Sequence, residues 1–212
     1  MTAKEKNTEK LILEAAHRVF LKKGMSGARM QEIANEAGIN KALLHYYFKN
    51  KDMLFTSVFR VALGQFIPRL QSVLAGDRKF DEKLLQISAN YHEMLMENPY
   101  LPGFILQEVN REPEKLIALF KESGIDQDLV LVLLQKDIEE FIGKKIDPRH
   151  FLLSLLSLVI FPILAMPMMC GLFFENNRSE YELFLEQRKQ LVPELLMGGI
   201  KAMAMKLEEL EK

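Results

Sequence analysis

Apolar residues recur every three or four positions along most of the 212-residue chain, which is the spacing of one face of an α-helix. Between residues 7 and 23 the apolar positions are Leu11, Ile12, Ala15, Ala16, Val19 and Phe20, and Gly24 follows as a stop. No stretch alternates apolar and polar residues over the length of a strand. The pattern therefore predicts an all-α fold of about nine or ten helices.

Turn and capping residues set the expected ends of the later helices. The expected ranges are 51–75, 81–97, 102–110, 113–122, a helix from 126 or 127 to 145, one that starts at 148, and 179–211. Asn50, Asp147 and Ser179 have side chains that can accept a hydrogen bond from the first helical turn, so we expect them to cap three of these helices. Pro68 and Pro193 fall inside two ranges and are expected to bend them.

Residues 29–48 predict two short helices joined by a tight turn. The apolar positions are Ile33, Ala34 and Ala37 in the first helix and Leu44 and Phe48 in the second. Gly38 can adopt the positive φ that ends a helix, Ile39 fills the turn, and Asn40 is a strong N-cap for the helix that follows. This spacing is typical of a helix-turn-helix, whose second helix lies in the DNA major groove.

The same residues resemble the N-terminal domain of TetR-type transcriptional repressors. The shared positions are Ile33-Ala34, Ala37-Gly38-Ile39-Asn40, Leu44-His45-Tyr46-Tyr47-Phe48 and Lys51-Asp52-Met53-Leu54, at fixed spacing and without gaps. Arg29, Ala42, Leu43 and His45 depart from the family's pattern, and all four lie at or near the expected DNA surface. The resemblance implies a DNA-binding domain over residues 6–66 and a larger helical domain over residues 67–212 that binds a ligand and dimerises.

Eleven residues are expected to contact DNA: Arg29, Gln31, Asn40, Lys41, Ala42, Leu43, His45, Tyr46, Tyr47, Lys49 and Lys51. Asn40 and Lys41 can donate to base edges or phosphates, whereas Ala42 and Leu43 can contact thymine methyl groups. Arg29, Gln31, Tyr47, Lys49 and Lys51 are placed to hold phosphates. The alternative for each lysine is a solvated surface charge.

The charge distribution is consistent with this assignment. Residues 1–60 carry 11 Lys and Arg against 6 Asp and Glu, a net charge of +5, whereas the remainder carries 17 against 23, a net charge of −6. A basic N-terminal part on an acidic body is the asymmetry expected when one end of a protein meets phosphates. Five charges can also cluster by chance.

An uncharged stretch over residues 151–174 has two interpretations. Its length would allow a membrane-spanning helix. The resemblance instead implies that the last two long helices pack against the same pair of a second subunit, which explains a helix that is apolar on every side. We therefore expect no membrane association and a homodimer interface that contains Leu155, Leu158, Leu191, Leu195 and Leu196.

The larger domain contains most of the 12 methionines and 14 phenylalanines, and flexible methionines suit varied apolar ligands. Residues expected to line a ligand pocket are Tyr91, His92, Met94, Phe104, Glu108, Phe120, His150 and Phe151. Most of the apolar ones can instead simply fill the core. Four histidines without CxxC or HExxH spacing form no metal framework, so we expect no cofactor and no enzymatic activity.

Together these features predict a cytoplasmic, homodimeric, ligand-responsive transcriptional repressor. It is expected to bind a palindromic operator in double-stranded DNA and to be released by a small apolar or amphipathic effector. Two alternatives remain open from the sequence. One is a membrane-attached helical protein that uses residues 151–174, and the other is a helical carrier or enzyme that uses an apolar cavity.

Overall fold

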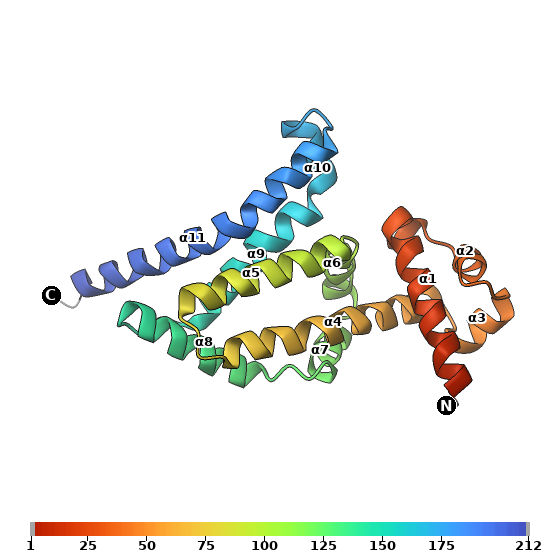
Figure 1. Cartoon of the computed structure of the whole chain (residues 1–212), viewed down its shortest axis with the longest axis horizontal. Helices are drawn as coiled ribbons and strands as arrows, with labels where there is room; N and C mark the ends of the chain where they lie inside the picture. The colour runs from red at the N-terminus through yellow and green to blue at the C-terminus, as the bar shows by residue number, and fades with distance from the viewer. Residues whose placement is uncertain (1–2, 211–212) are drawn as a thin grey trace. The chain divides into compact units, whose positions relative to one another are not determined.

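The computed structural model describes residues 3–210, and these form eleven α-helices and no strand (Figure 1). The helices are α1 (Ala3–Gly27), α2 (Met30–Glu36), α3 (Lys41–Tyr47), α4 (Lys51–Ala75), α5 (Phe80–Glu97), α6 (Leu101–Arg111), α7 (Pro113–Glu122), α8 (Gln127–Ile142), α9 (Pro148–Leu164), α10 (Met166–Phe173) and α11 (Arg178–Leu210). The all-α prediction is confirmed. The helices outnumber the prediction because the uncharged stretch breaks at Ala165, which separates α9 from α10.

Most of the expected helix ends are found. Gly24 has φ 65° and ψ 177°, so it interrupts α1 and only one further turn follows it. Asn50 accepts a hydrogen bond of 2.8 Å from the backbone N–H of Met53, and Asp147 accepts one of 2.9 Å from that of Arg149. These side chains satisfy backbone donors that have no partner inside the helix, which fixes where α4 and α9 begin.

Two expected helix ends were wrong. The cap of α11 is Asn177 rather than Ser179, because the Asn177 side chain accepts from the backbone N–H of Glu180 at 3.2 Å and the helix starts one residue later. Helix α8 ends at Ile142 rather than Lys145. Gly143 has a left-handed φ of 71° and donates its N–H to the carbonyl of Glu139, which closes the helix there.

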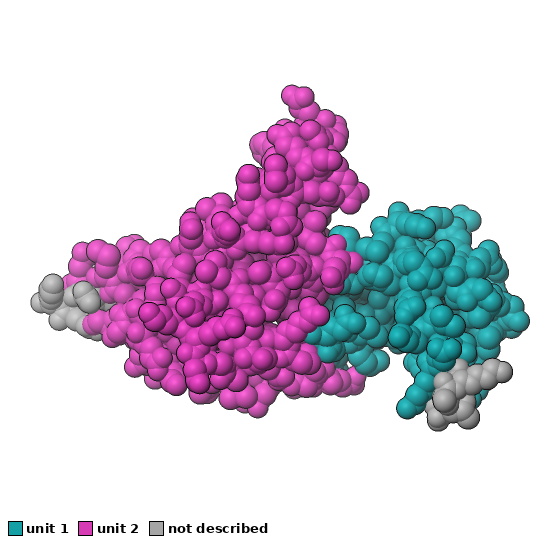
Figure 2. Space-filling model, viewed as in Figure 1, with its two compact units in different colours: residues 1–65, 98–119 teal, residues 66–97, 120–212 magenta. Residues whose placement is uncertain are grey.

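The chain divides into two compact units, shown in different colours in Figure 2. Unit 1 comprises residues 1–65 and 98–119, and unit 2 comprises residues 66–97 and 120–212. The division falls inside α4, between residues 65 and 66. Residues 98–119, which contain α6 and most of α7, belong to unit 1 together with the N-terminal helices.

Aromatic side chains attach α6 to the other helices of unit 1. The ring of Phe104 lies 4.3 Å from that of Phe55 on α4, measured between ring centres. Tyr100, at the start of α6, packs against Phe20 on α1, and its hydroxyl lies 2.5 Å from Nδ1 of His17. This packing buries Phe20, Phe55 and Phe104 almost completely, so α6 completes the core of unit 1.

The core of unit 2 lies between α5, α8, α9 and α11. Helix α9 contributes a buried row at four-residue spacing, Phe151, Leu155, Val159 and Ile163, and α11 contributes Tyr181, Leu185, Val192, Leu196 and Ile200. Two residues expected in the dimer interface, Leu155 and Leu196, are thus used by the chain's own core, with 5% and 7% exposure. The sequence could not separate Leu155 from its neighbours because α9 is apolar on all sides.

Pro162 lies inside α9 and has no backbone N–H to donate to the carbonyl of Leu158. The guanidinium of Arg188 on α11 donates to that carbonyl instead, at 3.0 Å. The hydroxyl of Tyr181 donates to the carbonyl of Pro162 at 2.7 Å. Side chains of α11 therefore supply partners to the backbone of α9 where its ladder is interrupted.

Among the described residues, no single helix is long and apolar enough to cross a membrane. Helices α9 and α10 meet that criterion only as a pair, and they are bent by 70° relative to each other.

Candidate nucleic-acid interface

Helices α2 and α3 form a helix-turn-helix with the predicted turn. Gly38 has φ 67°, and the N–H of Ile39 donates to the carbonyl of Ala34 at 3.0 Å, which closes the end of α2. The side chain of Asn40 accepts from the N–H of Leu43 at 2.8 Å and so caps α3. The local conformation therefore follows from a glycine that tolerates positive φ and an asparagine that caps the next helix.

Helix α3 is anchored by Leu44, which is fully buried, and by Phe48 just after its end. The rest of its first two turns is exposed, which leaves Lys41, Ala42, Leu43, His45 and Tyr46 free to meet a partner. Tyr46 is 75% exposed although it is large and aromatic. An exposed helix face with one cation and several apolar groups matches the donor and methyl pattern of base edges in a major groove.

A backbone contact sets the tautomer of the neutral His45 side chain. Its Nδ1 lies 3.1 Å from the backbone carbonyl of Lys49, and a carbonyl can only accept a hydrogen bond. Nδ1 therefore carries the proton, and Nε2 of the neutral ring is an acceptor. An acceptor at this position suits the amino group of adenine or cytosine.

The residues expected to hold phosphates lie around α3 in unit 1. Arg29 and Lys49 are exposed, and Gln31 donates from its amide to the side chain of Asn35 at 2.9 Å. Lys51 differs from the expectation, since its ammonium points to the backbone carbonyls of Ser26 and Ala28 at 3.4 and 3.2 Å. Lys51 therefore joins the start of α4 to the α1–α2 connection, and a phosphate contact would use its remaining donor.

Cations on α1 neutralise the acidic residues of α2. Arg18 lies 2.6 Å from Glu36, and Lys23 lies 2.8 Å from Glu32. The hydrogen bond from Arg18 lowers the pKa of Glu36, and the hydrogen bond from Lys23 lowers the pKa of Glu32. In each of these exposed pairs the positive charge of the cation balances the negative charge of the carboxylate. Glu32 and Glu36 therefore add little net negative charge to this surface.

A helix-turn-helix with an exposed second helix is typical of DNA-binding proteins. Residues 12–58 match the family described as "Bacterial regulatory proteins, tetR family". The helix-turn-helix of this chain is therefore of the TetR type.

Two curated relatives come from Bacillus subtilis. The chain is 23% identical to the uncharacterized HTH-type transcriptional regulator YerO over 159 residues, which are 71% of this chain and 55% of that protein. It is 30% identical to the fatty acid metabolism regulator protein over 84 residues, which are 40% of this chain and 43% of that protein. The chain thus spans about half the length of these curated relatives.

Among solved structures, the transcriptional regulator FadR from Bacillus subtilis, crystallised in complex with stearoyl-CoA, has the same fold. The likeness covers 90% of this chain and 98% of that chain, with a TM-score of 0.64 and 22% identity. The shared fold therefore extends from the helix-turn-helix to 90% of the chain.

The residues expected to line a ligand pocket do not form one group. Phe104 and Glu108 belong to unit 1, whereas Tyr91, His92, Met94, Phe120, His150 and Phe151 belong to unit 2. Glu108 is buried and already paired, since Arg111 lies 2.9 Å and Lys115 lies 3.6 Å from its carboxylate. Phe151 packs on Phe80 in the core, and His150 is exposed.

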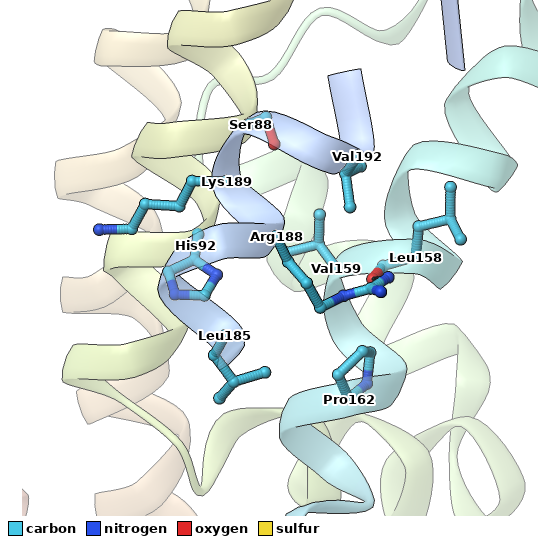
Figure 3. Close-up of a pocket in the computed structure, with 9 residues that line it drawn as sticks. All are labelled: Ser88, His92, Leu158, Val159, Pro162, Leu185, Arg188, Lys189 and Val192. Atoms are coloured by element: carbon cyan, nitrogen blue, oxygen red, sulfur yellow. Dashed lines mark hydrogen bonds between the residues drawn. The ribbon is translucent and has the colours of Figure 1, made fainter. Parts of the chain in front are cut away.

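A pocket of unit 2 is lined by one of the expected residues, His92 (Figure 3). Its cavity of about 10 Å³ has room for about one water molecule. Its lining comes from three helices: Ser88 and His92 on α5, Leu158, Val159 and Pro162 on α9, and Leu185, Arg188, Lys189 and Val192 on α11. Ser88, Arg188 and Lys189 were missed from the sequence. Ser88 did leave a signal, because it lies four residues before His92 on a helix face that is otherwise apolar.

Proposed function

We propose that this chain is a TetR-family regulator that represses transcription by binding a palindromic DNA operator as a homodimer. The observation that carries the proposal is the exposed face of α3, with Lys41, His45 and Tyr46 held outward by the buried Leu44. The positive charge of residues 1–60 supports it, because phosphate attraction supplies most of the affinity that does not depend on sequence.

A dimer is required because two recognition helices must read two half-sites about 34–36 Å apart. The exposed apolar side chains of α9 and α11 support a dimer through these helices: Leu153 and Phe161 on α9, and Leu183, Leu191 and Leu195 on α11. Of the interface residues expected from sequence, Leu191 and Leu195 remain candidates, together with the half-buried Leu158. Burying such a face against its copy removes apolar area from water, which favours association.

We further propose that a small apolar or amphipathic effector releases the protein from its operator. The structure of FadR with stearoyl-CoA supports an effector of this class. An effector lowers DNA affinity only if it binds more tightly to the conformation that cannot bind DNA, and by linkage DNA must lower effector affinity by the same factor. In this chain α4 is the helix that begins beside the recognition helix and continues into unit 2.

The experiment is a footprint of the purified chain on the DNA that flanks its own gene, followed by titration of the complex with stearoyl-CoA and smaller amphipathic compounds. A protected palindrome, a dimer in sedimentation and release by at least one compound are expected. Absence of any protected site at low salt would overturn the DNA-binding proposal. A protected site that no compound releases would overturn only the proposed regulation.

A further inference from the structure

The neutral His45 ring can accept a hydrogen bond from outside the chain but cannot donate one. Its Nδ1 proton is used by the carbonyl of Lys49, 3.1 Å away, and Nε2 lies on the other side of the ring. Within residues 3–210 the ring makes no second hydrogen bond, and the side chain is exposed. Nε2 therefore offers a free lone pair beside Lys41, whose ammonium can only donate.

A lone acceptor cannot bind the DNA backbone. Phosphate oxygens accept hydrogen bonds and have none to donate at neutral pH, so two acceptors would face each other. In the major groove the donors are the amino groups of adenine and cytosine, whereas guanine and thymine present only acceptors and a methyl group. A hydrogen bond from duplex DNA to Nε2 of His45 must therefore come from a base.

The neighbours of His45 on α3 favour one base pair over the other. Lys41 lies four residues before His45 and Ala42 three residues before it, so the three exposed side chains share one helix face. An A·T pair presents the amino group of adenine next to O4 and the methyl group of thymine, whereas a C·G pair has no methyl group. Nε2 of His45 suits the amino group, the ammonium of Lys41 suits O4, and Ala42 suits the methyl group.

We propose that His45 selects an A·T pair in each half-site of the operator, with Nε2 accepting a hydrogen bond from the 6-amino group of adenine. The carbonyl of Lys49 holds the tautomer that makes this contact possible. The inference rests on the proposed function, since a base is read only when α3 enters the major groove. It adds the base pair and the atom that recognises it.

The first test compares operators that the parent and His45→Phe select from randomised duplex DNA. Phenylalanine keeps a ring at this position but has no acceptor. The parent should prefer A·T at one position of each half-site, and His45→Phe should lose that preference while keeping the others. His150→Phe is the matched control, because this histidine is exposed on α9 of unit 2 and its replacement should leave every preference unchanged.

The second test replaces adenine at the selected position with purine, which lacks only the 6-amino group. The parent should bind the altered duplex about twofold to tenfold more weakly for each half-site, which is the effect of one hydrogen bond. His45→Phe should bind both duplexes alike, because it has no acceptor to lose. Lys49→Ala should bind both duplexes more weakly than the parent does but keep the parent's ratio between them.

The third test concerns the chain without DNA. NMR of the ring nitrogens should show the proton of neutral His45 on Nδ1. The chain has four histidines, and the signals of His45 are identified by their loss in His45→Phe. The melting temperature of His45→Phe should equal that of the parent within a few degrees, because the side chain is exposed.

Four results would overturn the proposal: unchanged base preferences in His45→Phe, equal binding of adenine and purine duplexes by the parent, selection of a pair other than A·T, or a proton on Nε2 in the free chain. A loss in His45→Phe that is equal for all sequences and reduces the salt slope would assign His45 to a phosphate instead. All of these outcomes leave operator binding intact. A parent that selects no sequence would overturn the proposed function itself.

Discussion

The ammonium group of Lys83 on α5 lies 2.9 Å from each carboxylate oxygen of Asp137 on α8, and both side chains are buried. The same ammonium donates to the carbonyl of Leu74 near the end of α4, at 3.0 Å. One cation thus joins three helices of unit 2. All three of its donors are used, which is the condition under which a buried ion pair is tolerated.

Lys83→Met should destabilise the chain by about 3–5 kcal/mol, because it leaves the carboxylate of Asp137 buried without a partner. The double variant Lys83→Met with Asp137→Leu should recover much of this loss, since no charge is then stranded. Urea unfolding measures both. Lys136→Met is the control, because that side chain is exposed and should change stability by less than about 0.5 kcal/mol. A loss in Lys83→Met no larger than in the control would contradict the buried-pair argument.

On DNA, Lys41→Ala should weaken operator binding and relax sequence preference, because Lys41 lies at the start of the recognition helix. Lys49→Ala should weaken binding to all sequences alike and reduce the slope of log K against log salt by about one unit. Fluorescence anisotropy at several salt concentrations distinguishes the two effects, with Lys136→Ala as control. Affinities equal to the parent in both variants would show that another surface contacts DNA.

Lys51→Ala should behave differently from either variant. Its ammonium holds the backbone carbonyls of Ser26 and Ala28, so the substitution removes support from the turn before α2 as well as a positive charge. We expect a lower melting temperature together with weaker binding to DNA. A variant with the parent's melting temperature and a reduced salt slope would show that Lys51 acts only on phosphate.

For the dimer, the informative pair of substitutions is Leu195→Glu and Leu196→Glu. Leu195 is 51% exposed, so the glutamate is solvated in the monomer and should oppose only association. Leu196 is 7% exposed, so a glutamate there would be buried in the chain's own core and should destabilise the fold by several kcal/mol. Sedimentation with circular dichroism should show a folded monomer for the first and an unfolded or aggregated chain for the second. A dimeric Leu195→Glu variant would place the interface elsewhere.

Local signals predicted the parts of the fold that depend on a few consecutive residues. Gly38 and Asn40 specify the turn of the helix-turn-helix through backbone conformation and capping, and both behave as expected. The sequence could not show which of Leu195 and Leu196 faces the core, because Leu191 and Leu195 form a second apolar row on α11 beside Val192, Leu196 and Ile200. The attachment of Tyr100 and Phe104 to the N-terminal helices depends on contacts over more than 40 residues, which no local pattern records.

In the candidate sites, too, the sequence predicted features set by consecutive residues but not those set by distant contacts. The residues expected to read base edges follow one another at the start of α3, so they could be predicted as a set. The pocket residues could not, because Ser88 and Arg188 are 100 positions apart in the chain and meet only when α5 packs against α11. Of the residues expected to bind a ligand, His92 alone lines this pocket.

The last prediction concerns His92 and acid. Burial is the largest cause that lowers the pKa of His92 below 6.5. The positive charges of Lys189 and Arg188 lower it further, against the opposing effect of Glu186 and Glu93. The folded chain therefore keeps this imidazole neutral at a pH where an unfolded histidine is protonated.

Since the unfolded state binds the extra proton, the free energy of unfolding should fall as the pH drops below about 6.5, until the pH passes the folded pKa. His92→Gln removes this proton and should flatten the profile of urea midpoint against pH in that window. His150→Gln, at an exposed histidine, is the matched control and should keep the parent's slope. Asp147 does not interfere with this measurement. Arg149 lowers the pKa of Asp147 from 3.8 to about 2, so the contribution of Asp147 to the free energy of unfolding is lost only at more acidic pH. Parallel profiles for the parent and His92→Gln between about pH 7 and 5 would show that His92 is protonated in the folded chain as readily as in the unfolded one.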